Sequence, residues 1–191
     1  MIGILLAAGF SRRFGESDKL LQALPDGNPI ALASAKSLIE AIPFSIAVVR
    51  PENKALALSL QDAGLKVFFC SEQQTEMADS LSAAINFSAS FSESSDGFVI
   101  ALADMPYINS HTTSAVASKL SEGASIVVPT YQGKRGHPVG FSAKFRADLE
   151  SLHGDEGARS ILKRYPEEIV FLECDDSGIL ADIDTPADLK L

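Results

Sequence analysis

A loop with glycines and basic residues follows the first apolar run of the chain. Leu6-Ala7-Ala8-Gly9 leads into this loop, which carries Arg13 and ends at Lys19. Small residues let backbone N–H groups approach an anion, and the cations of Arg13 and Lys19 add charge, so the pattern predicts phosphate binding. The glycines have the wrong spacing for a Walker motif or a dinucleotide fingerprint. A surface turn with solvated basic residues is the alternative interpretation.

Carboxylates follow two other apolar segments. Asp104 stands after the apolar run 98–103, and Asp182 and Asp184 flank Ile183. In an extended segment residues i and i+2 share a face, so both aspartates of this pair should point the same way while Ile183 points to the core. Mg²⁺ takes one or two carboxylates plus substrate phosphates, which these residues could provide. The structural alternative is a turn-forming aspartate before a proline, and a threonine, Thr185, that caps a short helix.

Two single residues could contact a substrate. Arg159 falls in the first turn of a predicted helix, where a cation opposes the helix dipole, so an anion nearby is one explanation and a solvated arginine the other. His137 lies in a glycine-containing loop, and a metal role for it would need partners that His111 and His153 do not supply. No credible Ser/His/Asp or Cys/His arrangement for nucleophilic catalysis is present.

Apolar runs alternate with helix-length segments, which places these residues near the ends of strands. Strands are predicted at 2–8, 44–49, 65–70, 98–103, 124–129 and 169–174, and helices at 29–43, 51–64, 78–91, 109–123, 142–152 and 156–165, with a short last helix from Pro186. The alternation predicts an α/β three-layer sandwich with a mostly parallel sheet and one antiparallel insertion around 131–141. Ligands of such sheets collect at the carboxyl ends of the strands.

The composition narrows the class of protein. A chain of 191 residues is expected to form one domain, 1–191. No apolar run reaches the roughly 18 to 20 residues that span a bilayer, and no basic residue precedes the first apolar run as in a secretory signal, so we expect a cytoplasmic protein without a membrane partner. The net charge of -9 and the lack of a Lys/Arg block argue against nucleic acid. Both cysteines end apolar runs and are expected to be buried, reduced thiols.

The motifs, taken in order, resemble those of the molybdenum cofactor nucleotidyltransferases over essentially the whole chain. Within that family the match is to the CTP-using cytidylyltransferases. The residues that carry the resemblance are Leu6-Ala7-Ala8-Gly9 through Arg13 and Lys19, Asp104-Met105-Pro106, Gly136-His137-Pro138, Gly154 to Arg159, and Asp182-Ile183-Asp184-Thr185-Pro186.

The resemblance implies a nucleotidyltransferase fold of the glycosyltransferase-A type. It also implies an activity: CMP passes from CTP to the terminal phosphate of molybdopterin carrying molybdenum, pyrophosphate leaves, and the cytosine dinucleotide cofactor can go to an acceptor molybdoenzyme. Other readings stay open: a guanylyltransferase, a nucleotidyltransferase acting on a phosphorylated sugar or alcohol, and a non-catalytic cofactor carrier.

Roles for individual residues also follow from the resemblance. Leu6-Ala7-Ala8-Gly9, Arg13 and Lys19 would bind the nucleotide, and Arg13, Lys19 and Asp104 would be catalytic. Asp104 would hold Mg²⁺, with Asp182 as the preferred second ligand and Asp184 in reserve. His137 and Arg159 would bind a substrate. Members of the family that use GTP tend to read Leu-Ala-Gly-Gly, so the methyl group of Ala8 would narrow the pocket in favour of a pyrimidine.

Overall fold

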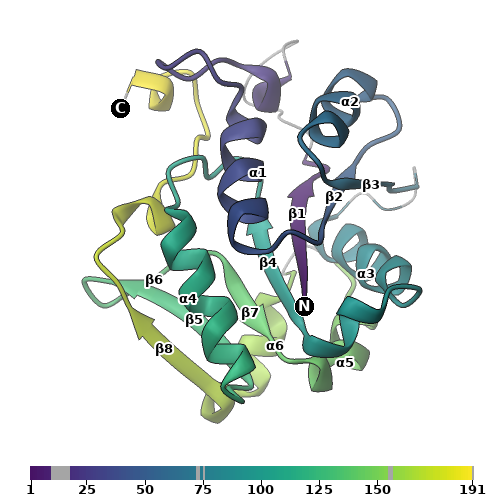
Figure 1. The fold of residues 1–191 in the computed structure, drawn as a ribbon, viewed down its shortest axis with the longest axis vertical. Helices are drawn as coiled ribbons and strands as arrows, with labels where there is room; N and C mark the ends of the chain where they lie inside the picture. Colours follow the sequence, from purple (N-terminus) through teal and green to yellow (C-terminus); the bar gives the residue numbers. More distant parts are fainter. Residues whose placement is uncertain (10–17, 72–73, 75, 155–156, 191) are drawn as a thin grey trace.

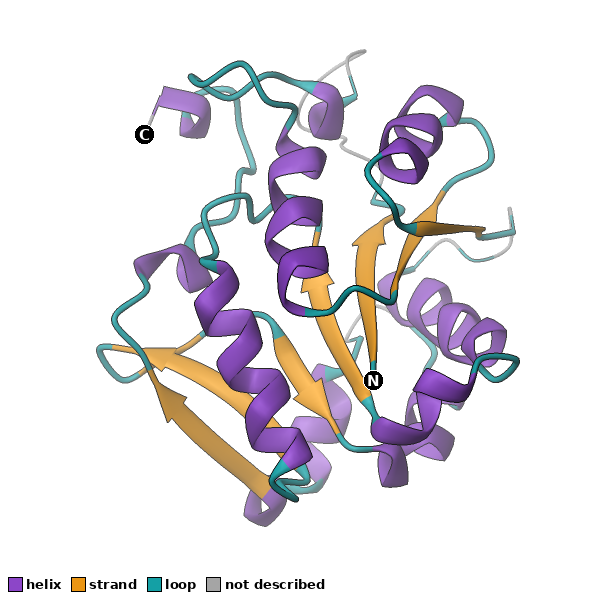
Figure 2. Cartoon of the chain, viewed as in Figure 1, coloured by secondary structure: helices purple, strands orange, loops and turns teal. Residues whose placement is uncertain are grey.

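The computed structural model describes residues 1–9, 18–71, 74, 76–154 and 157–190 of the chain. These residues form a central sheet between two layers of helices (Figures 1 and 2). The sheet is mostly parallel, with an antiparallel insertion in the segment 131–141. The α/β three-layer prediction is therefore confirmed.

The strands follow the predicted order closely. They are β1 (Ile2–Ala7), β2 (Ser45–Val49), β3 (Lys66–Phe69), β4 (Phe98–Leu102), β5 (Ile126–Tyr131), β6 (Lys134–Arg135), β7 (Val139–Phe141) and β8 (Ile169–Glu173). The α-helices are α1 (Ile30–Ala41), α2 (Lys54–Asp62), α3 (Met77–Ser88), α4 (Ser110–Ser121), α5 (Arg146–Glu150) and α6 (Arg159–Arg164).

Strand order brings the ends of distant segments together. The sheet runs β3-β2-β1-β4-β7-β5, with β6 and β8 also paired to β5. β1 lies between β2 and β4, and its register places Leu6 beside Val48 on one side and Leu102 on the other. Because these three strands are parallel, the residues that follow them gather at one edge of the sheet.

Each face of the sheet is covered by its own helices. Leu5 and Ala7 of β1 lie in a core cluster with α1, α2 and α4, whereas Ile2 and Ile4 lie in a second cluster with α3, α5 and α6. Successive side chains of a strand point to opposite faces, so a strand buried on both faces reads as one continuous apolar run. This explains why β1 and β4 stand out so clearly in the sequence.

Several element boundaries differ from the predictions. α2 begins at Lys54 rather than at Pro51, because the Asn53 N–H donates to the Arg50 carbonyl (3.0 Å) and holds this stretch in a turn. The last helix does not begin at Pro186. The backbone N–H and the hydroxyl of Thr185 donate to Asp188, and only one 3-10 turn, Asp188–Lys190, follows.

Two further properties follow from the described residues. No helix among them is both long and apolar enough to cross a membrane. Neither cysteine forms a disulfide, but only Cys70 is buried, whereas Cys174 is partly exposed, so the expectation of two buried thiols was wrong for Cys174.

Candidate active site

The end of β1 forms the floor of the first cavity. Leu6, Ala8 and Gly9 line it, whereas Ala7, from the same motif, points into the core on the other face of the sheet. Strand alternation dictates this division, because neighbouring side chains cannot share a face. Ala7 can therefore act at the site only through its backbone. Arg13 lies outside the described residues.

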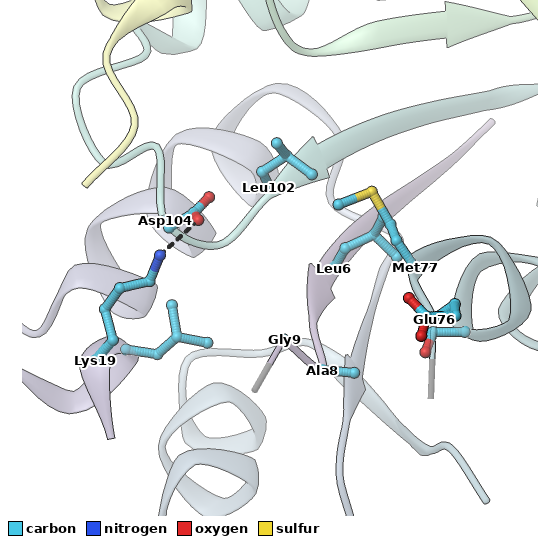
Figure 3. A pocket seen from close by; sticks show the side chains of 10 residues that line it. Leu6, Ala8, Gly9, Lys19, Glu76, Met77, Leu102 and Asp104 are labelled. Carbon is cyan, nitrogen blue, oxygen red and sulfur yellow. Dashed lines mark hydrogen bonds and ion pairs between the residues drawn. The ribbon is translucent and has the colours of Figure 1, made fainter. Parts of the chain in front are cut away.

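Lys19 reaches this cavity from a 3-10 turn, Lys19–Leu21. The side chain of Asp18 caps the turn by accepting from the Leu20 N–H. Lys19 is 8% exposed, and its Nζ lies 2.8 Å from Asp104 Oδ2 (Figure 3). The same Nζ lies 3.7 Å from Asp184 Oδ1. A buried ammonium group is tolerated only when charges of opposite sign compensate it, and these two carboxylates do so.

The segment 182–184 is held against the end of β4. The Ile183 N–H donates to the Asp104 carbonyl (2.9 Å), and the Ile183 side chain is buried in the core as predicted. The aspartates on either side of Ile183 differ in their surroundings. Asp184 lies beside Lys19, whereas the charge of Asp182 acts on the imidazole of His137. Asp104 and Asp184 therefore share Lys19 as a partner, whereas Asp182 acts on His137.

The donors present fit a divalent cation that is shared with a phosphorylated ligand. Among the described residues, Asp104 Oδ2 accepts a hydrogen bond from Lys19, and no group of three or more His, Cys, Asp or Glu side chains is placed to hold a metal ion. Mg²⁺ does not require a cage made only of protein groups, since it keeps waters and takes substrate phosphates. Asp104 with one carboxylate of the Asp182/Asp184 pair is a donor set of that kind.

His137 is held by backbone contacts on both sides. The Gly136 N–H donates to the Pro129 carbonyl (2.9 Å) and the His137 N–H to the Ile179 carbonyl (3.1 Å). Nδ1 of His137 is buried and has no hydrogen-bond partner among the described residues. Burial lowers the pKa of His137 below its ordinary value, and Arg159 lowers it further, against the opposing charges of Asp104 and Asp182. His137 is therefore a neutral imidazole at neutral pH.

A second cavity, of about 740 Å³, adjoins the first. Leu6, Met77 and Leu102 line both cavities, so the two share a wall at the ends of β1 and β4. His137 and Arg159 both line the second cavity, so the structure brings together two residues that the sequence suggested separately.

The lining of the second cavity combines cations with an apolar floor. Arg135, Arg159 and Lys163 supply positive charge, and side chains such as Ile100 and Val139 supply apolar surface. In a protein with a net charge of -9, three cations in one cavity are a local reversal of the overall charge. Such a lining suits a molecule with an apolar or planar body and anionic groups.

Sequence reasoning missed Arg50, which contacts the Ala8 carbonyl beside the first cavity, and several residues that line the two cavities. Arg50 directly follows β2, so the rule that ligands gather at strand ends should have indicated it. Lys163 is four positions after Arg159 in α6, and that spacing places both on one helix face. Glu76 and Ser80, at the start of α3, line the first cavity, and no signal in the sequence pointed to them.

The chain is similar to several known proteins. The chain is 32% identical to the purine catabolism protein PucB of Bacillus subtilis, and the match covers 100% of this chain and 95% of that protein. The structure is similar to that of Rv0371c from Mycobacterium tuberculosis in complex with manganese, with a TM-score of 0.77 and 23% identity over 99% of this chain and 95% of that one.

A third similarity is to a nucleotidyl transferase from Methanothermobacter thermautotrophicus, with a TM-score of 0.79 and 19% identity over 98% of this chain and 93% of that one. These structures share the glycosyltransferase-A-like nucleotidyltransferase fold. The family model that describes the MobA-like NTP transferase domain matches residues 3–169. The chain is therefore a nucleotidyltransferase that belongs to the family of MobA-like NTP transferase domains.

Proposed function

We propose that this nucleotidyltransferase acts as one domain, 1–191, that transfers CMP from CTP to the terminal phosphate of molybdopterin carrying molybdenum. The products are the cytosine dinucleotide cofactor and pyrophosphate. The observation that carries the proposal is the pair of adjoining cavities, which meet at Leu6, Met77 and Leu102 beside Lys19 and Asp104. Two substrates held in cavities that share a wall can present their phosphates to each other.

The first cavity would take the nucleotide. Leu6, Ala8 and Gly9 would lie along it, with the Ala7 backbone between them, and Lys19 and Arg13 would neutralise the triphosphate. Negative charge on the leaving pyrophosphate grows in the transition state, so a fixed cation there assists the reaction more than it assists binding. Lys19 is already held in place by two carboxylates and needs little reorganisation.

Asp104 and Asp182 would hold Mg²⁺, with Asp184 as the alternative second ligand. A bound Mg²⁺ would neutralise charge on the triphosphate and orient it. The structural relative from M. tuberculosis was solved with manganese, which supports a divalent ion at a site of this kind. Asp184 also has a second role, because its carboxylate helps to hold Lys19.

The second cavity would take the acceptor. Arg159, with Arg135 and Lys163, would bind its anionic groups, and the apolar floor would support the pterin. His137 lines this cavity and is neutral at neutral pH, so it would contribute a hydrogen bond rather than a charge. A phosphate oxygen of the acceptor then attacks the α-phosphorus of CTP, and the bond to the pyrophosphate oxygen breaks. No side chain has to form a covalent intermediate.

The choice of base and the recipient of the product complete the proposal. The Ala8 methyl group lies in the first cavity and is 7% exposed, so it narrows the space beside the nucleotide and favours a pyrimidine. The B. subtilis relative is named for purine catabolism. We therefore infer that the acceptor molybdoenzyme for this cofactor acts in purine breakdown. The net charge of -9 and the lack of a Lys/Arg block support a protein that does not bind nucleic acid. We expect it to act in the cytoplasm, without a membrane partner.

The decisive experiment is incubation of the purified chain with Mg²⁺, molybdopterin loaded with molybdenum, and each NTP in turn. We expect pyrophosphate release and a cytosine dinucleotide with CTP, and loss of both in Lys19→Met. Lys144→Met is the matched control, because Lys144 also forms a 2.8 Å ion pair, with Glu168, but is exposed and lies outside both cavities. Preference for GTP would make the chain a guanylyltransferase. If a product forms only with a sugar phosphate or an alcohol phosphate, that compound replaces molybdopterin as the acceptor. Binding without turnover would show that the chain is a carrier.

A further inference from the structure

Arg50 lies directly after β2, and its guanidinium is buried beside the end of β1. The residue is 6% exposed, and its Nε donates to the Ala8 carbonyl at 2.7 Å. The parallel register pairs Ala7 with Val49, so Ala8 stands opposite Arg50, one step beyond the last backbone pair. A side-chain donor thus continues the hydrogen bonding of the sheet past the point where the strands end.

This contact constrains one peptide unit closely. A guanidinium is a rigid planar donor, and a charge-assisted bond of this length is stronger than one between neutral groups. Burial adds to the constraint, because a buried cation that lost an acceptor would bear a large desolvation cost. The Ala8 carbonyl is therefore held pointing at Arg50.

The orientation of that carbonyl also sets the orientation of the next N–H group. The Ala8 carbonyl and the Gly9 N–H belong to one planar trans peptide unit, in which the two groups point in opposite directions. Since the carbonyl points toward Arg50, the Gly9 N–H points away from it, on the side of the cavity that Ala8 and Gly9 line. A Cβ built on Gly9 would meet none of the described residues within 4 Å, so among them nothing blocks the approach of a ligand to the peptide.

We propose that Arg50 is a positioning residue for the nucleotide: it fixes the Ala8–Gly9 peptide so that the Gly9 N–H donates to a phosphate oxygen. The inference rests on the proposed nucleotide site. It assigns to Arg50 a role that acts through the backbone, without contact between its side chain and the nucleotide. Backbone N–H groups at the start of a loop are well suited to bind anions when their direction is fixed.

The test compares Arg50→Met with Arg146→Met in the full chain. Arg146 is a matched control, because its guanidinium also donates to backbone carbonyls, those of Ser94 and Ile85, but packs on Phe98 at the other end of β4. The phosphate is bound in both the ground state and the transition state, so we expect KM for CTP to rise about 10- to 100-fold in Arg50→Met with kcat within about three-fold. Arg146→Met should change neither constant by more than about two-fold.

A spectroscopic measurement separates positioning from a general loss of structure. In protein labelled with 15N-glycine, addition of CTP with Mg²⁺ should shift the Gly9 amide resonance of the wild type and of Arg146→Met, and should leave it nearly unmoved in Arg50→Met. Should Arg50→Met fail to fold, Arg50→Lys carries the test. Its ammonium lies beyond the position of Nε, and KM is expected to rise at least three-fold.

The outcomes distinguish the inference from the function on which it rests. If the wild type binds and turns over CTP, but the Arg50 variant that folds keeps the wild-type KM and Gly9 shift, the positioning role is wrong and the proposed function stands. A fall in kcat with KM unchanged would also overturn it, because that pattern belongs to a group acting on the transition state. If the wild type neither binds nor uses CTP, the proposed function fails and the inference falls with it.

Discussion

The ion pair between Lys19 and Asp104 should couple the two residues strongly in stability. The atoms are 2.8 Å apart, and the side chains are only 10% and 25% exposed. At an effective dielectric constant of about 20 this separation gives a gross attraction of about 6 kcal/mol. Desolvation of both groups offsets most of that, so we expect a net coupling of about 1 to 3 kcal/mol.

The two single variants should not be equally harmful. Asp104→Asn removes the carboxylate charge next to Lys19, the more deeply buried of the two residues. The charge of Lys19 is then compensated by Asp184, which is farther away at 3.7 Å. Lys19→Met leaves a carboxylate that retains more access to water. We therefore expect Asp104→Asn to cost about 2 to 4 kcal/mol of unfolding free energy, and Lys19→Met about 1 to 2 kcal/mol.

The assay is urea unfolding of the wild type, both single variants and the double variant, with activity measured as pyrophosphate release. The pair formed by Lys144 and Glu168 has the same 2.8 Å separation at the surface, and it should show a smaller coupling that salt weakens further. Equal coupling in the two pairs would refute the reasoning, because burial would then contribute nothing. Activity should be lost in both Lys19 and Asp104 variants, and the double variant should not recover it.

Three further outcomes follow from the site. Asp182→Ala should lower kcat at least about 100-fold with little change in Tm, because a metal ligand contributes several kcal/mol of transition-state stabilisation. A larger effect in Asp184→Ala would make Asp184 the second ligand. Ala8→Gly should relax, without inverting, the ratio of kcat/KM for CTP over GTP, since one methyl group is worth about 1 to 3 kcal/mol; an unchanged ratio removes Ala8 from the explanation. The pKa of His137 is lowered in the folded protein, so the unfolded chain binds more protons below the ordinary value of 6.5. Unfolding free energy should therefore fall as the pH drops from about 6.5 toward 5, by at most about 1.4 kcal/mol per pH unit, and His137→Gln should lose this slope.

The sequence was most informative where burial on both faces leaves a simple pattern. β1 and β4 are continuous apolar runs, and the residues two positions beyond their ends, Gly9 and Asp104, were identified for that reason. Helix boundaries were less predictable, because turn contacts such as that between Arg50 and Asn53 decide where α2 begins. Helix propensity alone does not predict such contacts.

Which site residues touch one another could not be read from the sequence. Lys19 and Asp104 are 85 positions apart, and only the strand order and the turn at Lys19 bring them together. The different partners of Asp182 and Asp184 depend on how the segment passes Lys19 and His137, because it is not a regular strand. The second cavity likewise arises from the distance between α6 and the sheet, which no local pattern encodes.

The segment 177–184 completes the site from late in the chain, which has a consequence for synthesis on the ribosome. Its Ile179 and Ile183 hold His137 and Asp104 through backbone bonds, and Asp184 compensates Lys19. At about 5 to 20 residues per second, translation from Asp104 to Asp184 takes about 4 to 16 s, and during that time the sheet can begin to form while the acidic centre is incomplete. The nascent chain can therefore begin to bury its core, with Lys19 paired to Asp104 alone, before Asp184 is made, so the site is complete only when this last segment is added.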